Sequence, residues 1–470
     1  MKKQPVNIID SGHSPNFTII MLAWPIFIEQ VLLALVKAVD TAMVGSLGKE
    51  ATAAVAINYS PNMVMDGVMI ALGIGFTSLV ARSVGARDLA RARNFLKQGL
   101  LAITAIGLAL SIFCFVCARK IPIWMGGYPE ILDDAEIYNQ ITAISILFRG
   151  LTIMLTAIYR GYGDSKSPMI INVLVNALNV IGNFLMIYPT RPLTLLGRTF
   201  TMFGFGWGVA GAAVSTALSG VLGGVILLIM CFTKDTPLRL TLKESYAPDP
   251  VALKAVLEIS VPTMLERFFQ TSAFLLLSRT VATLGTAQLA AHQVAATAES
   301  LSFMPGFAFG TAVTTLFGQS IGAKRTDLAH DYVVHTLKMG TVTMALMTLV
   351  LFLWPTPIIS LFTPDAEVIR MGSTLLRLLA LIQIPQMAAS VYSGALKGAG
   401  DAKSSLVLTL SSIWGVRIAG IMFSVYVLHL GLYSICVCMD IDNVVRWILF
   451  HLRYRQGKWK QLGEKGTGQA

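Results

Sequence analysis

Long apolar segments separated by short polar breaks recur along the whole chain. Residues 100–116 and 339–353 are two examples, and the breaks divide the chain into about twelve such segments. A helix of about 20 apolar residues crosses a hydrocarbon core of about 30 Å, and it satisfies its own backbone hydrogen bonds in lipid. The alternating pattern of a membrane barrel strand is missing. The pattern therefore predicts an all-α integral membrane protein with twelve helices, which start near residues 17, 51, 98, 136, 168, 207, 255, 288, 333, 368, 405 and 430.

The composition also indicates a membrane protein. Of the 470 residues, 55% are hydrophobic and only 13% are charged, and the mean hydropathy is +0.68. A water-soluble chain of this length could hardly cover its surface with so few polar residues. Residues 1–16 are polar and lack an apolar segment with a cleavage site, so we expect no cleaved signal peptide.

The net charge of +11 does not indicate a nucleic-acid partner, because the cations lie in alternate loops. The loops after the second, fourth, sixth, eighth and tenth helices are rich in Lys and Arg, whereas the other loops hold few. By the positive-inside rule, both termini face the cytoplasm. We expect a multi-pass protein of the cell membrane, the bacterial cytoplasmic membrane being the expected location.

The chain repeats itself. A shift of 237 positions places Pro25 on Pro262, Glu29 on Glu266, and residues 83–86 on residues 320–323. The same shift places 161–166 on 398–403 without a gap. Past the fifth helix the shift falls to 223, so the first half carries 14 extra residues around 190–203, in a loop predicted to lie outside.

Six helices per half give both copies the same orientation, as in a parallel repeat about an axis along the membrane normal. Such symmetry favours a transporter with alternating access, although a purely structural duplication is the alternative. The predicted organisation is a cytoplasmic tail (1–16), an N-lobe (17–232), a cytoplasmic linker (233–254), a C-lobe (255–452) and a second cytoplasmic tail (453–470).

Four runs carry a resemblance to a known family, and they follow one another in the family's order: 39–45 (VDTAMVG), 299–307 (ESLSFMPGF), 318–323 (GQSIGA) and 394–398 (GALKG). Together they resemble the multidrug and toxic compound extrusion (MATE) family over about residues 17–455. The resemblance implies a V-shaped pair of six-helix lobes. It also implies multidrug efflux, in which small amphipathic, often cationic compounds are exported in exchange for protons or sodium ions, with no cofactor. The protein is expected to act as a monomer.

Intramembrane polar residues are functional candidates, because a charge inside a helix costs several kcal/mol unless it faces a cavity, a partner or an ion. Asp40 is the strongest candidate, and it matches the N-lobe cation site of the family. Asn179 and Asn183, spaced i, i+4 on one face, could offer oxygens to an ion or hydrogen bonds to Asp40. Thr216 could complete this cation-coupling cluster. A capping role for Asp40 is the alternative.

Several positions depart from the sodium-coupled pattern. The family often has Asp where this chain has Asn183, and its sodium-coupled bacterial branch has acids where this chain has Gln270 and Gln386. Sodium needs several oxygen ligands, so the loss of a carboxylate weakens its site. We therefore predict proton coupling through Asp40, with Na⁺ at Asp40 as the alternative and no other metal.

The residues assigned to the substrate cavity are Glu266, Glu299, Gln270, Gln386 and Lys37. Glu299 is the expected C-lobe contact for a cationic substrate. Glu29 and Glu266 each follow a helix-bending proline, Pro25 and Pro262, by one turn, and they are either structural brackets or contacts for substrate or protons. Lys37 either supports the ionised Asp40 across one turn or extends to the outer interface. The charges that sequence alone leaves unpaired are Asp66, Arg149, Arg279 and Arg417.

Two other functions compete. A flippase for lipid-linked precursors, or a polysaccharide exporter of the same superfamily, would need a basic cavity for pyrophosphate, and the acidic candidates argue against it. An integral-membrane enzyme such as a prenyltransferase would need paired Asp-rich motifs, whereas the adjacent pair Asp133 and Asp134 lies in an outside loop without a second motif. We therefore expect a transporter rather than an enzyme.

Overall fold

The computed structural model describes residues 8–195, 198–241 and 243–465. The first half holds η1 (Ile8–Asp10), α1 (Pro15–Gly45), α2 (Lys49–Ala56), α3 (Tyr59–Gly85), α4 (Leu89–Val116), α5 (Lys120–Trp124), α6 (Pro129–Tyr162), α7 (Lys166–Ile187), β1 (Pro189–Leu195), β2 (Arg198–Phe205) and α8 (Gly208–Thr233). The second half holds α9 (Pro250–Ala282), α10 (Thr286–Ser302), α11 (Met304–Gly322), α12 (Thr326–Leu353), α13 (Pro355–Ser360), α14 (Ala366–Leu381), α15 (Gln383–Ala399), α16 (Ala402–Ser412), η2 (Ile413–Ile418), α17 (Ala419–Met422), η3 (Phe423–Val427), α18 (Leu432–Arg455) and α19 (Lys458–Lys465).

The twelve predicted membrane helices are present in the described chain. Eight spans are long and apolar enough to cross a membrane, and the pairs α10–α11 and α14–α15 add two more, each bent by 46° at a short break. α9 and α18 complete the set with 33 and 24 residues. The predicted starts of α4, α6 and α12 fall several residues late, because the polar first turns of these helices precede the apolar segment that the pattern detects.

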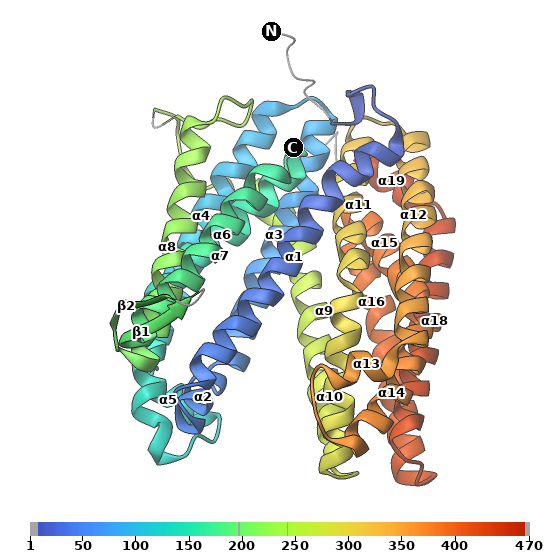
Figure 1. Ribbon diagram of the computed structural model, residues 1–470. Coiled ribbons are helices and arrows are strands. Elements are labelled where there is room, and N and C mark those ends of the chain that lie inside the picture. Colours follow the sequence, from blue (N-terminus) through green and yellow to red (C-terminus); the bar gives the residue numbers. More distant parts are fainter. Residues whose placement is uncertain (1–7, 196–197, 242, 466–470) are drawn as a thin grey trace.

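The two halves form two groups of helices that meet at one end and diverge toward the other (Figure 1). The end where they meet holds η1 and α19 and is called the terminal end; the opposite end, called the far end, holds α2, α5, α13 and the β1–β2 hairpin. The hairpin contains the extra residues of the first half, and its two strands pair antiparallel. The segment predicted as an extra loop is therefore a hairpin at the far end.

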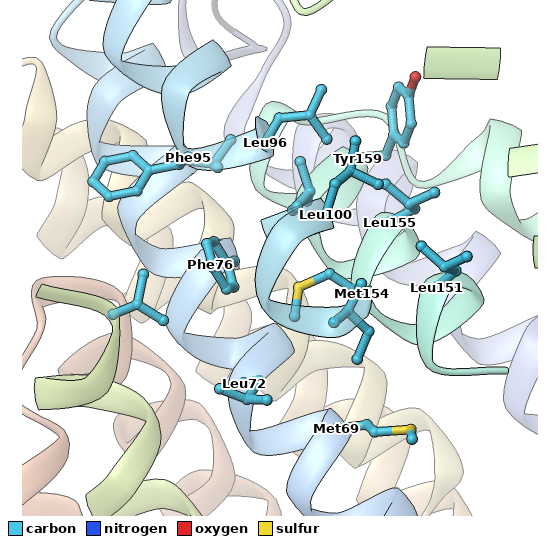
Figure 2. Packing of buried hydrophobic residues seen from close by; sticks show 14 of the residues in the cluster. Met69, Leu72, Phe76, Phe95, Leu96, Leu100, Leu151, Met154, Leu155 and Tyr159 are labelled. Carbon is cyan, nitrogen blue, oxygen red and sulfur yellow. The ribbon is translucent and has the colours of Figure 1, made fainter. Parts of the chain in front are cut away.

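A buried apolar cluster fills the first half near the terminal end. Met69, Leu72 and Phe76 of α3 lie together with Met154 of α6 and Leu100 of α4 (Figure 2). Aliphatic, sulfur and aromatic side chains of this kind interdigitate closely, and in lipid their van der Waals contacts, rather than the exclusion of water, stabilise the packing of the helices. The cluster holds α3, α4 and α6 together as a unit.

α1 and α9 connect the halves, because each packs into the core of the other half near the terminal end. Ile19 of α1 belongs to a buried cluster with Phe317 of α11. Val256 of α9 belongs to the cluster of Phe76 in the first half. The repeat in the sequence thus produces a reciprocal exchange of helices.

Backbone contacts between the halves are equally reciprocal. A β-carbon added at Gly85 would lie 2.0 Å from the carbonyl oxygen of Gln319, and one added at Gly322 would lie 2.0 Å from the carbonyl oxygen of Arg82. The 237-residue shift relates Gly85 to Gly322 and Arg82 to Gln319. Only glycine allows main chains to approach this closely, so both glycines fix the contact between the halves.

Hydrogen bonds follow the same symmetry. The Ser78 hydroxyl donates to the carbonyl oxygen of Lys397 at 2.7 Å, and the Thr315 hydroxyl donates to the carbonyl oxygen of Arg160 at 3.0 Å. Asp10 of η1 adds ion pairs to Arg87 of the first half and Arg325 of the second, at 3.1 and 3.7 Å. The halves are therefore held together at the terminal end by polar and apolar contacts.

Candidate functional site

Asp40 and Asn183 meet between α1 and α7 in the first half. The Asn183 side-chain amide donates to Asp40 Oδ1 at 2.6 Å. Asn183 is only 1% exposed, and Asp40 is half-buried. A hydrogen bond to a carboxylate is stronger than one between neutral groups, so this contact fixes the orientation of the Asp40 side chain.

Asn179 extends the cluster to α8. Its side-chain amide donates to Thr216 Oγ1 at 3.4 Å and to Ser219 Oγ at 3.3 Å, while its backbone carbonyl oxygen accepts from Ser215 Oγ at 2.8 Å. A β-carbon at Gly182 would lie 2.5 Å from Ser215 Oγ, so the glycine permits this close approach of α7 and α8. Ser215 and Ser219 were not predicted, because only their position beside α7 distinguishes them from other serines.

Asp40, Asn179, Asn183 and Thr216 therefore lie in one connected cluster on three helices. The side-chain oxygens of Asn179 and Asn183 are buried and have no hydrogen-bond partner in the described structure. Buried polar atoms without partners are uncommon and mark places where an ion, a proton carrier or water can bind. The cluster has both a titratable carboxylate and free oxygen acceptors.

Lys37 does not pair with Asp40 in the described structure. Its ammonium lies 5.7 Å from the centroid of the Tyr59 ring. The side chain is exposed. The sequence left two roles open for Lys37. The first of them, a direct ion pair that supports the ionised Asp40, does not form in the described structure.

Glu29 and Glu266 occupy matching ion-pair clusters. Glu29 contacts Arg160 at 2.5 Å and accepts from Asn172 at 3.0 Å. Glu266 contacts Lys397 at 3.0 Å, and it also accepts hydrogen bonds from Ser405 and Thr409 at 3.2 and 3.4 Å. The 237-residue shift maps Arg160 onto Lys397 and Asn172 onto Thr409. Both carboxylates are thus already neutralised by basic partners, which is the arrangement of a structural bracket.

Pro25 and Pro262 lie inside the continuous helices α1 and α9. The breaks of 46° occur elsewhere, between α10 and α11 and between α14 and α15. The bending role of the two prolines stays a prediction.

Glu299 lies at the end of α10, next to the break before α11. Gln383 donates to Glu299 Oε1 at 3.4 Å, and the Gln386 side chain also hydrogen-bonds to Glu299. The side-chain oxygens of both glutamines are buried without a partner in the described chain. Gln270 makes no hydrogen bond to the described residues and lies half-buried on α9. Glu299 and Gln386 therefore belong to one polar cluster, which sequence analysis did not extend to Gln383.

A third cluster was missed. Asp442 of α18 is fully buried, lies 2.6 Å from Arg417 of η2 and also contacts Arg446 and Ser412. Asp442 and Arg446 are spaced i, i+4, a signal that could have been read. η2 is a π-helix, which often marks a functional or strained position. Arg417, which the sequence left unpaired, is therefore paired with Asp442.

The other charges left unpaired by the sequence are also placed. Arg149 Nε lies 3.0 Å from Asp66 Oδ1, and Arg279 is exposed near the end of α9. No group of three or more His, Cys, Asp or Glu side chains that could hold a metal ion occurs in the described residues.

Comparison with known proteins gives consistent matches over the whole chain. The MatE family profile matches residues 25–185 and 262–423, one segment in each half. The probable multidrug resistance protein NorM of Thermotoga maritima is 28% identical over 449 residues, covering 94% of this chain and 93% of that protein. The uncharacterized transporter YisQ of Bacillus subtilis is 26% identical over 453 residues, covering 95% and 96%.

Solved structures share the fold. A MOP superfamily transporter from Pyrococcus furiosus matches with a TM-score of 0.88 and 24% identity, covering 98% of this chain and 99% of that chain. An outward-facing multidrug resistance MATE family transporter of the MOP superfamily matches with the same score, identity and coverage. These matches show that the chain has the same fold as these two transporters.

Proposed function

Because the chain belongs to the MatE family of membrane transporters, with a matched segment in each half, we propose that it is an antiporter. It exports small amphipathic, often cationic organic compounds in exchange for protons, and Asp40 carries the exchanged proton. The similarity to probable multidrug resistance proteins NorM supports the substrate class.

The observation that carries the proposal is the contact between Asp40 and Asn183 at 2.6 Å. Asn183, which binds the carboxylate, and Asn179, which binds Thr216, are spaced i, i+4 on α7, and the side-chain oxygens of both amides are buried without partners in the described structure. A carboxylate beside such amides can gain and lose a proton while its neighbours reorganise their hydrogen bonds. Exchange of one proton per cycle needs only this one carboxylate.

The arrangement supports protons over sodium. A sodium site needs several oxygens directed at one point. Asn183 instead directs its N–H at Asp40, and its oxygen points elsewhere without a partner. If sodium binds, then Asp40, Asn179, Asn183 and Thr216 are the residues that would hold it after rotation of the amides.

Alternating access follows from the two halves. The described state is closed at the terminal end, where the halves share reciprocal contacts, and divergent at the far end. With the termini in the cytoplasm, as the distribution of basic residues indicates, this state faces outward. Protonation of Asp40 changes the charge inside the first half and so changes the relative stability of the outward and inward states.

Transport in inverted membrane vesicles tests the proposal. A proton gradient should drive dye transport by the wild type, and Asp40→Asn should abolish the driven component because the amide keeps the size but cannot exchange a proton. Asp133→Asn, which removes an exposed carboxylate near the far end, is the matched control and should transport at the wild-type rate.

Asp40→Asn that retains driven transport would remove Asp40 from the mechanism. Strong transport driven by a sodium gradient at equal pH on both sides would replace the proton with sodium. Correct folding of the variant is checked by its elution from a size-exclusion column.

A further inference from the structure

Arg267 is an intramembrane cation whose guanidinium forms no hydrogen bond or ion pair with the described residues, although its charge interacts with that of the adjacent Glu266. It lies at the middle of α9 and is half-buried. The adjacent Glu266 is already paired with Lys397 at 3.0 Å, and Arg267 forms no ion pair or hydrogen bond with the described residues. A cation inside the membrane is costly in free energy unless it faces a partner or a water-filled space. The position of Arg267 is therefore typical of a residue that binds a ligand.

The face of α9 that carries Arg267 runs from the contact between the halves into the region where they diverge. Val256, Ser260, Arg267 and Phe274 share this face, because they are spaced by four or seven residues. Val256 is 1% and Ser260 is 2% exposed, and a β-carbon at Gly75 of α3 would lie 2.2 Å from Ser260 Oγ. Phe274, two turns beyond Arg267, is 49% exposed. Arg267 thus lies where α3 of the other half stops covering this face.

The matching face of α1 is also basic. The 237-residue shift maps Ala23 onto Ser260, Gln30 onto Arg267 and Lys37 onto Phe274. Ala23 is 6% exposed, whereas Lys37 is exposed. The facing sides of the two halves therefore each carry one cation just beyond the point of divergence.

The acids near these cations are already neutralised. Asp66, which lies close enough to Lys37 to interact with its charge, is paired with Arg149 at 3.0 Å. Glu266 is held by Lys397. Asp66 and Glu266 therefore do not neutralise Lys37 and Arg267 on these facing sides.

We propose that Arg267 binds a carboxylate of the transported compound between the two halves. The substrates are therefore amphipathic molecules that carry a carboxylate, alone or together with an ammonium group. A guanidinium matches a carboxylate through two parallel hydrogen bonds, which an ammonium does not offer. The exposed ring of Phe274 on the same face offers an apolar surface for the rest of the molecule. This inference rests on the proposed export function and names its substrate class.

Two rhodamines test it, a dye with a free benzoate group and its methyl ester, which differ only in the carboxylate charge. Fluorescence anisotropy with purified full-length protein measures the Kd of each dye. The wild type should bind the free acid more tightly than the ester. Arg267→Gln should weaken the free acid roughly ten- to a hundredfold, as expected for a lost charge-assisted hydrogen bond, and should leave the ester unchanged.

Two variants serve as controls. Arg279→Gln removes a cation from an exposed position on the same helix, and it should leave both Kd values unchanged. Arg267→Lys keeps the charge but loses the paired geometry, so it should retain part of the preference for the acid. Unchanged binding of the ester shows that a variant is folded.

Equal weakening of both dyes by Arg267→Gln would make Arg267 a structural residue and overturn the inference. An unchanged ratio of the two Kd values, or a wild type that does not bind the free acid, would overturn it as well. Binding that follows the expected pattern without gradient-driven transport of either dye in proteoliposomes would count against the proposed export function instead.

Discussion

Alanine at Gly85 should shift the protein away from the state in which the two halves meet at the terminal end. The added β-carbon would lie 2.0 Å from the carbonyl oxygen of Gln319, and the next contacts are also backbone atoms, at 2.7 and 2.8 Å. β-Carbons essentially never approach closer than 3.0 Å. A rotamer change cannot relieve the clash, so the two halves must separate by about 1 Å at the terminal end.

The cost of this separation can be bounded. Overpacking of a close contact typically costs about 1–3 kcal/mol, which corresponds to a change of roughly five- to 150-fold in the ratio of the two states. The same penalty applies at Gly322, whose β-carbon would lie 2.0 Å from the carbonyl oxygen of Arg82. Because the inward state opens the terminal end, it escapes the clash, and both variants should increase its population.

Distances between spin labels measure this shift. Lys49 and Thr286 are exposed at the far end on opposite halves. Labels on cysteines at these two positions, in a background without native cysteines, should move closer in Gly85→Ala and Gly322→Ala. Gly67→Ala is the matched control on the same helix as Gly85, since its β-carbon meets nothing within 4 Å. A distance distribution in Gly85→Ala identical to that of Gly67→Ala would refute the reasoning.

Three further predictions concern stability and coupling. Lys397→Met should lower the free energy of unfolding by about 3 kcal/mol because Glu266 stays buried without its partner, and adding Glu266→Gln should restore part of it, as thermal unfolding in detergent will show. The Ala252 backbone N–H and then the Asn94 side chain lower the pKa of Asp249 at the start of α9. Asp249→Ala should therefore lower the free energy of unfolding by about 1 kcal/mol at neutral pH. This loss should persist down to the ordinary aspartate pKa of 3.8 and should disappear as the pH falls through the lowered pKa of Asp249 in the folded protein. A loss that does not depend on pH would contradict this prediction. Gln270→Ala should leave the ion dependence of dye transport unchanged, because an amide supplies no charge for a sodium site; a switched ion requirement would show otherwise.

Apolar periodicity and the internal repeat predicted twelve membrane helices in two equivalent halves, and the resemblance to the MATE family implied their V-shaped arrangement. Membrane helices satisfy their own backbone groups, so length and hydropathy alone locate them. The 237-residue shift then predicted symmetric halves, and it relates the glycine contacts at Gly85 and Gly322 one to one. Helix starts were less well predicted, since hydropathy marks the entry into lipid and not the first hydrogen-bonded turn.

The sequence predicted which residues belong to the N-lobe cluster, but not which of them contact one another. The free-energy cost of a charge inside the membrane identified Asp40 as a candidate, and helical spacing placed Asn179 and Asn183 on one face. That Asn183 contacts Asp40 at 2.6 Å, while Lys37 contacts Tyr59 instead, depends on how α1, α3 and α7 are placed. The distances between side chains on different helices depend on how the helices pack, and the periodicity of the sequence does not predict that packing.

Tertiary structure alone decided which charges are free. Glu266 and Arg267 are neighbours in the sequence, where only Glu266 was singled out as a candidate. In the folded protein, Glu266 points to Lys397 inside its own half, whereas Arg267, about 100° further around the helix, lies on the face where the halves diverge. The sequence determines that two adjacent charges lie at the middle of α9. The packing of the helices determines which of these two is neutralised and which is left for a ligand.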